Sequence, residues 1–192
     1  MTGSRSTSVG MLGSGFMAHT YAECLARHID DAHLVAVALG TRAPPLAEAY
    51  EVTHEPTAEA LHARGDIDVV VVATPHSTHV ELATAVAAVG KHLYLEKPMA
   101  VDVAGCDAII EAGDGWEDVH EMPPFKLVGD HRDPVRLMAF PAQLAEFAAD
   151  VCQWRTPAVG GTDGRAAVEL VEAARISSER DAAVHLPLDV GP

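Results

Sequence analysis

Cysteine and long apolar runs are scarce in this sequence, and each scarcity excludes a class of protein. The three cysteines, Cys24, Cys106 and Cys152, form no C-x-x-C pair, which excludes a disulfide framework and a zinc ribbon. The first eight residues are polar with a single arginine, and no later stretch has the length of a membrane span. We therefore expect a cytoplasmic protein.

Basic residues are also few. Thirteen Lys and Arg face 28 Asp and Glu, a formal net charge of −15, so the long-range field repels nucleic acids and anionic membranes. We expect neither as a partner. An anionic ligand would have to be held by local geometry, such as backbone N–H groups at a helix N-terminus. With 48% hydrophobic residues, the 192 residues suffice for one full domain and a small appendage.

Short apolar runs alternate with helical patterns through the first 112 residues. Val9 to Leu12 leads into a glycine turn and then a helix that reaches about Arg27. Further strands are expected at 34–38, 68–73 and 92–95, and the four consecutive valines of the second of these are typical of a strand buried on both faces. This alternation predicts an α/β fold with a doubly wound parallel sheet.

Residues 113–192 are expected to form a reduced appendage of short strands and two helices. Short extended stretches are expected at 116–122 and 135–140. One helix follows, with an apolar stripe at Leu144, Phe147, Ala148, Val151 and Cys152. Another begins near Thr162 as N-cap, with a stripe at Ala167, Leu170, Val171 and Ala174. Since each helix has one apolar stripe, we expect both to pack on the sheet.

The glycine turn fits the pattern G-x-G-x-x-[GA]. The first glycine permits a tight turn, the second lets a pyrophosphate approach the backbone, and the small Ala18 lets helix and strand pack closely. Its place after the first strand and before a helix predicts a Rossmann dinucleotide site; a purely structural glycine turn is the alternative. The residues expected to contact the dinucleotide here are Gly13, Ser14, Gly15, Phe16 and Met17.

The end of the second strand bears on the choice of cofactor. An acidic residue there would bind the ribose hydroxyls of NAD, but residues 38–42 contain no carboxylate. Thr41 and Arg42 could hold a 2′-phosphate, which favours NADP slightly over NAD. An exposed loop arginine is the competing interpretation.

Two more groups of residues follow strands and are expected at the same rim of the sheet. The first group is Ala73, Thr74, Pro75, His76 and His79. No cysteine or carboxylate cluster accompanies the two histidines, so we expect cofactor contact or helix capping and no metal. Glu96 and Lys97 form the second group. A lysine beside a nicotinamide can exchange a proton with a substrate while hydride moves; a surface lysine paired with Glu96 is the alternative.

Three blocks, at 13–18, 66–79 and 90–98, together resemble the Gfo/Idh/MocA oxidoreductase family. The resemblance implies an N-terminal Rossmann domain at 1–112 that binds NAD or NADP, with Lys97 as a catalytic residue. It also implies a Lys97–Pro98 peptide that is often cis in relatives. Residues 143–187 resemble the closing region of the family, which implies a final strand at 183–186.

Family members are roughly twice as long, as two domains require, so we expect a shortened member that lacks most of the second, substrate-binding sheet. Asp181 to His185 has the family's D-x-x-x-H spelling but lies in the expected closing strand, and we interpret it as a coincidence. The leading hypothesis is hydride transfer between NAD(P) and a sugar-like hydroxyl or carbonyl substrate. The alternatives are a non-catalytic dinucleotide-binding or regulatory protein and an interaction protein. An open strand edge in 113–192 would allow a homo-oligomer.

Overall fold

A parallel sheet of five strands forms the centre of the molecule. The computed structural model describes residues 6–113, 134–155 and 159–188. The strands are β1 (Thr7–Leu12), β2 (Ala32–Ala38), β3 (Thr53–His54), β4 (Val69–Val72) and β5 (His92–Leu95). They lie in the order β3-β2-β1-β4-β5, and every neighbouring pair is parallel. The expected doubly wound α/β fold is therefore confirmed, with the strand order reversing between β1 and β4.

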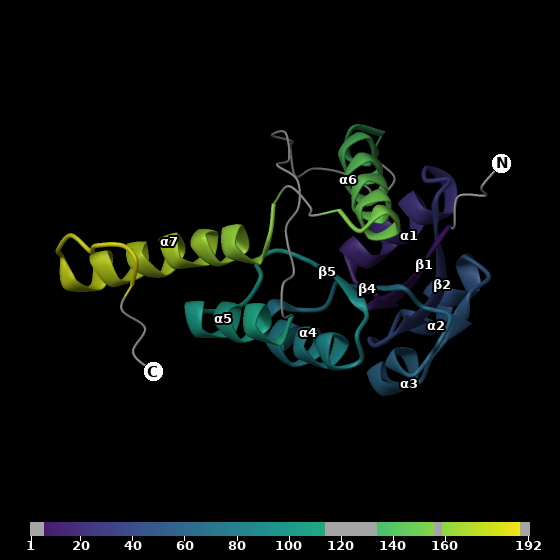
Figure 1. Cartoon of the computed structure of the whole chain (residues 1–192), viewed down its shortest axis with the longest axis horizontal. Coiled ribbons are helices and arrows are strands. Elements are labelled where there is room, and N and C mark those ends of the chain that lie inside the picture. Colours follow the sequence, from purple (N-terminus) through teal and green to yellow (C-terminus); the bar gives the residue numbers. More distant parts are fainter. Residues whose placement is uncertain (1–5, 114–133, 156–158, 189–192) are drawn as a thin grey trace.

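Helices cover both faces of this sheet (Figure 1). They are α1 (Phe16–Arg27), α2 (Ala43–Ala49), α3 (Ala58–His62), α4 (His79–Ala88) and α5 (Val103–Ala112), with a short 3-10 turn η1 (His76–Thr78) before α4. The valines of β4 explain the two layers, because side chains alternate along a strand. Val69 and Val71 pack with α1 and α2, whereas Val70 and Val72 pack with α3 and α4. Because β4 has no polar side chain, it suits a position that helices cover on both faces.

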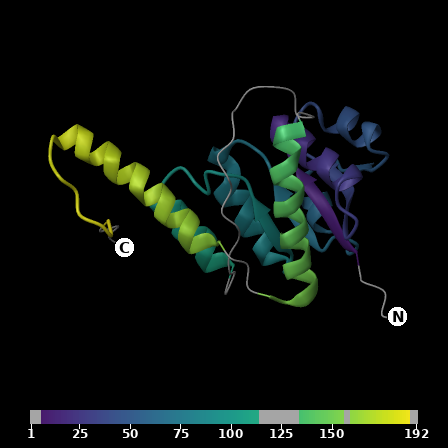
Figure 2. The same ribbon diagram turned by 90° about the horizontal axis from the view of Figure 1, so that it is seen from above.

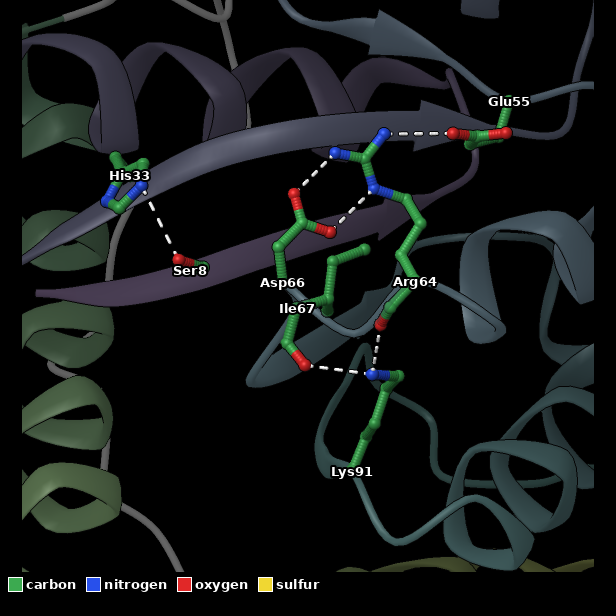
Figure 3. A network of polar contacts seen from close by, with 7 residues as sticks. All are labelled: Ser8, His33, Glu55, Arg64, Asp66, Ile67 and Lys91. Atoms are coloured by element: carbon green, nitrogen blue, oxygen red, sulfur yellow. Dashed lines mark hydrogen bonds and ion pairs between the residues drawn. The ribbon is translucent and has the colours of Figure 1, made fainter.

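Polar contacts tie together the segments before β4 and β5 and the residue that follows β3. Figure 3 shows Arg64 bonded to both Asp66 and Glu55, while Lys91 donates to the carbonyl oxygens of Arg64 and Ile67 at 2.7 and 2.9 Å. Burial lowers the pKa of Lys91, and the two carboxylates raise the pKa of Arg64. These contacts join the chain entering β4 to the chain entering β5. The opposite, carboxyl rim of the sheet carries the site described below.

Two helices of 20 residues follow, α6 (Pro134–Gln153) and α7 (Gly161–Arg180). As expected, α6 packs beside the sheet, where Phe140, Leu144, Phe147 and Ala148 join the core shared with α1 and β1. In contrast, α7 lies along α5 and extends beyond the body of the molecule (Figures 1 and 2). The expectation that α7 packs on the sheet is wrong. Among the described helices, none combines the length and apolar character needed to cross a membrane.

The prediction of which face of α7 is buried is also wrong. Leu170 and Val171 are 58% and 71% exposed, whereas Val168 and Ala173 are buried. Val168 packs with Cys106 and Ile109 of α5. An ion pair between Arg165 and Asp107 helps to set this rotation of the helix. Each of the two faces has apolar residues, so the partner helix decides which one is buried. 

Several expected boundaries differ in the structure. Residues 135–140 are helical, not extended, because Phe140 lies one turn before Leu144 and continues the same apolar stripe. Gly160, not Thr162, is the N-cap of α7, and its N–H donates to Asp163 at 3.1 Å. Residues 183–186 form no strand; the N–H of Leu188 instead donates to Glu169 of α7 at 2.7 Å. The stretch 116–122 lies outside the described residues.

Candidate functional site

A hollow of about 870 Å³ lies at the carboxyl ends of the strands. Segments that follow all five strands line it, among them the glycine turn after β1, the loop after β4, and Glu96 and Lys97 after β5. Of the residues expected at a cofactor site, each lines this hollow except His79. The hollow spans the point where the strand order reverses, which is where open α/β sheets bind their ligands.

At the glycine turn, the backbone after β1 comes close to the backbone after β4. Gly13 has a φ of +112°, and a Cβ there would lie 2.5 Å from the carbonyl oxygen of Ala73, so only glycine fits. A Cβ on Gly15 would instead meet nothing within 4 Å. Gly15 is also the N-cap of α1, which has no side-chain cap and no acidic residue in its first turn. This open helix N-terminus fits an anionic group such as a pyrophosphate.

The loop after β2 is tied to the glycine turn by Ser14. Gly40 has a φ of +88°, and a Cβ there would lie 2.3 Å from the Ser14 hydroxyl oxygen. The same oxygen accepts from the backbone N–H of Arg42 at 3.3 Å. Ser14 is therefore a buried part of the wall, while the side chains of Thr41 and Arg42 are exposed at the rim of the hollow.

The two histidines after β4 have different surroundings. His76 is exposed and lines the hollow, whereas His79 is 1% exposed. The His79 Nε2 lies 3.0 Å from the Thr74 carbonyl oxygen, and its Nδ1 lies 3.0 Å from that of Pro98. His79 thus ties the loop after β4 to the segment after β5, where Lys97–Pro98 is cis. Within the described residues no three potential ligands gather as a metal site.

Glu96 and Lys97 are adjacent in sequence but differ in burial. Glu96 is buried and accepts a hydrogen bond from the hydroxyl of Tyr21, while Lys97 is exposed at the hollow. No ion pair joins Glu96 to Lys97, both of which the structure describes. Burial raises the pKa of Tyr21 well above its ordinary value, so Tyr21 is a hydrogen donor at any ordinary pH.

Sequence reasoning missed the part of the hollow after β3. Thr57 and Glu59 line it, and the Thr57 hydroxyl caps α3 by accepting from the N–H of Ala60 at 3.1 Å. Hydrogen bonds from its own backbone and from Thr57 lower the pKa of Glu59. The Pro56-Thr57 pair before a short helical run was the available signal. The preceding strand of two residues is too short to show a period.

The segment that carries this site is similar to known proteins. The sequence profile of the Gfo/Idh/MocA family, described as an oxidoreductase family with an NAD-binding Rossmann fold, matches residues 7–116. Inositol 2-dehydrogenase of Rhizobium meliloti is 38% identical over 95 residues, which are 48% of this chain and 28% of that protein. Inositol 2-dehydrogenase of Acidothermus cellulolyticus is 34% identical over 115 residues, which are 58% of this chain and 34% of that protein.

A solved structure is similar to about the same share of this chain. The WlbA dehydrogenase from Bordetella pertussis, in complex with NADH and UDP-GlcNAcA, superposes with a TM-score of 0.55 at 28% identity. The match covers 57% of this chain and 32% of that one. The chain thus spans about a third of the length of the relatives it matches.

Proposed function

Because the chain belongs to the Gfo/Idh/MocA family of NAD-binding oxidoreductases, we propose that it transfers hydride between a nicotinamide dinucleotide and a sugar-like hydroxyl or carbonyl substrate. One observation carries the proposal: the glycine turn, the loop after β4 and Lys97 line a single hollow at the reversal of strand order. We assign dinucleotide binding to residues 1–112 and treat 113–192 as a smaller second part that packs on it.

The glycine turn holds the pyrophosphate in this proposal. The open space beside Gly15 and the uncapped N-terminus of α1 leave room for phosphate oxygens against backbone N–H groups. This local arrangement offsets the repulsion from the formal net charge of −15. Phe16 and Met17, which also line the hollow, begin the helix behind it.

The end of β2 supports a preference for NADP. Leu39 and Gly40 stand where an acidic residue would bind the ribose of NAD, and both have positive φ angles. Arg42 is exposed at the rim, and no ion pair occupies it within the described residues. A guanidinium is well suited to a 2′-phosphate because its planar donors match phosphate oxygens.

Lys97 is the proposed proton carrier. When bound, the nicotinamide supplies or accepts the hydride. The Lys97 amine then accepts a proton from the substrate hydroxyl during oxidation and returns it to the carbonyl oxygen during reduction. The names of the relatives, inositol 2-dehydrogenases, support a polyol or sugar as the substrate class.

Filling the space beside Gly15 tests the proposal. We expect Gly15→Val to abolish binding of NADH and NADPH in calorimetric titrations, because Gly15 lines the hollow and a Cβ there has no protein atom within 4 Å, so the valine takes space that the dinucleotide needs. Gly65→Val is the matched control, since a Cβ there also meets nothing within 4 Å and Gly65 does not line the hollow. A wild-type protein that binds neither dinucleotide would remove the proposal.

A non-catalytic dinucleotide-binding protein is the second candidate. The observation that favours it is the exposure of Lys97 in a chain that spans about a third of its relatives' length. It requires dinucleotide binding without oxidation or reduction of any member of a panel of polyols, sugars and keto-sugars. Turnover of one panel member by the wild type, and its loss in Lys97→Met, would eliminate this candidate.

A further inference from the structure

Tyr21 lies behind the hollow and connects α1 to the end of β5. Its side chain is 2% exposed, and its hydroxyl donates to an oxygen of Glu96, which lines the hollow. Building on the proposed function, we propose that Tyr21 is a positioning residue that presents Glu96 as a hydrogen-bond acceptor to the nicotinamide half of the dinucleotide. The packing of α6 holds Tyr21 in this role.

The Tyr21 hydroxyl is the donor in its hydrogen bond with the Glu96 carboxylate. Tyr21 has a single hydroxyl hydrogen, and this hydrogen goes to Glu96. The ring of Tyr94 lies beside that of Tyr21 and is buried with it. Burial raises the pKa of both phenols, which keeps both hydrogens in place. The Tyr21 hydroxyl thus fixes one oxygen of Glu96, and Glu96 lines the hollow.

Aromatic rings from α6 close this pair off from water. Phe140 meets Tyr21 edge-on with ring centroids 5.7 Å apart, and Phe147 meets Tyr94 edge-on at 5.3 Å. The two tyrosines meet each other in the same manner at 5.4 Å. Hydrogen bonds are stronger in such a dry environment than in water. Since α6 lies beyond residues 7–116, which match the family, this support for Glu96 comes from outside the matched segment.

The strand order decides which half of the dinucleotide Glu96 faces. In a doubly wound sheet the adenosine ribose lies at the end of the second strand. Here β2 and β5 lie on opposite sides of β1, so the rim after β5 faces the nicotinamide half. That half carries hydrogen donors, namely the carboxamide N–H groups and the ribose hydroxyls. A carboxylate with one oxygen fixed by Tyr21 is suited to accept from one of them.

Comparing two ligands tests the assignment. In calorimetric titrations we expect Tyr21→Phe to raise the Kd for NADPH or NADH about tenfold, and the Kd for ADP, with or without a 2′-phosphate, by less than about twofold, because ADP lacks both the nicotinamide and its ribose. The matched control is Tyr50→Phe, which removes another tyrosine-to-glutamate hydrogen bond of α1, from Tyr50 to Glu23 at 2.8 Å. Neither residue of that pair lines the hollow, so Tyr50→Phe should bind both ligands as the wild type does.

A double variant separates positioning from a general loss of structure. If Tyr21 acts through Glu96, Tyr21→Phe should add nothing to the weakening caused by Glu96→Ala. Equal weakening of NADH and ADP binding, additive effects in the double variant, or unchanged binding by Tyr21→Phe would each overturn the inference while the proposed function stands. A wild type that binds no dinucleotide would overturn both.

Discussion

The helices α6 and α7 have the same length of 20 residues, each with apolar residues at helical spacing, yet they are buried differently. The α6 helix inserts Leu144 and two phenylalanines into the core beside α1. The α7 helix buries Val168 against α5 and leaves Leu170 and Val171 exposed. An apolar stripe therefore predicts a helix but not its partner. The difference also has a functional side, because only α6 contacts the tyrosines behind the candidate site.

The largest expected effect concerns neither helix, because we assign the chemistry to the rim of the sheet. We expect Lys97→Met to lower turnover about 10²- to 10⁴-fold, the usual range for loss of a general acid or base, with dinucleotide affinity nearly unchanged. Lys97→Arg should be equally inactive, since a guanidinium keeps its proton. Steady-state kinetics and dinucleotide titrations measure the two quantities. Wild-type turnover in Lys97→Met would remove Lys97 from the mechanism.

One substitution made in both helices tests the comparison directly. We expect Leu144→Ala in α6 to lower the free energy of unfolding by about 2–5 kcal/mol, because it leaves a cavity in the core. Leu170→Ala in α7 should change it by less than about 0.5 kcal/mol, since 58% of that side chain is already exposed. Urea unfolding of the two variants measures both values. Equal costs would mean that α7 buries Leu170 in solution.

The two faces of α7 can be compared in the same way. Val168→Ala should cost about 2 kcal/mol, because the lost methyl groups pack against α5. Val171→Ala should cost less than about 0.5 kcal/mol. Both are measured by urea unfolding, and helix propensity is common to the two variants because the substitution is the same. A larger cost for Val171→Ala would show that the exposed face is the one that packs.

The contrast between the helices also marks what can be predicted from sequence. The sheet follows from local signals: the four valines of β4, the glycine turn and Gly90, whose φ of +68° ends α4 as expected. The site residues follow from a general rule, since parallel strands end at one rim. The burial of Val168 instead of Leu170 depends on contacts with α5, which no local pattern contains. The pairing of Tyr21 with Glu96, 75 residues apart, is likewise set only by the folded chain.

Replacing an exposed arginine at the rim of the sheet, and another at the end of α7, tests the proposed preference for NADP. We expect Arg42→Ala to weaken NADPH binding about tenfold and to leave NADH binding nearly unchanged, because only the 2′-phosphate loses a partner. Arg180→Ala, an exposed arginine at the end of α7, is the matched control and should leave both affinities unchanged. Parallel titrations with the two dinucleotides decide the matter. Equal affinities in Arg42→Ala and the wild type would remove the proposed preference for NADP.

Acid sensitivity is the smallest expected effect, and we assign part of it to His62 at the end of α3. The helices α6 and α7 contain no histidine. Burial lowers the pKa of His62, whose Nε2 is buried with no hydrogen-bond partner. Below the ordinary histidine pKa of about 6.5, the unfolded chain therefore binds a proton that the folded chain does not. Stability is fully present above this pH and falls as the pH drops toward the folded value. Loss of stability through carboxylates such as Asp66, whose pKa Arg64 lowers, comes at lower pH.

The variant His62→Leu isolates this contribution. We expect its free energy of unfolding at pH 7.5 to equal or exceed that of the wild type, because it removes a buried polar atom without a partner. Between pH 7.5 and pH 5 its stability should fall less than that of the wild type. The exposed His28, replaced in His28→Leu, serves as the control and should leave the wild-type pH dependence intact. Urea unfolding across this range measures the difference; a His62→Leu curve parallel to the wild type would mean that His62 is protonated equally in both states.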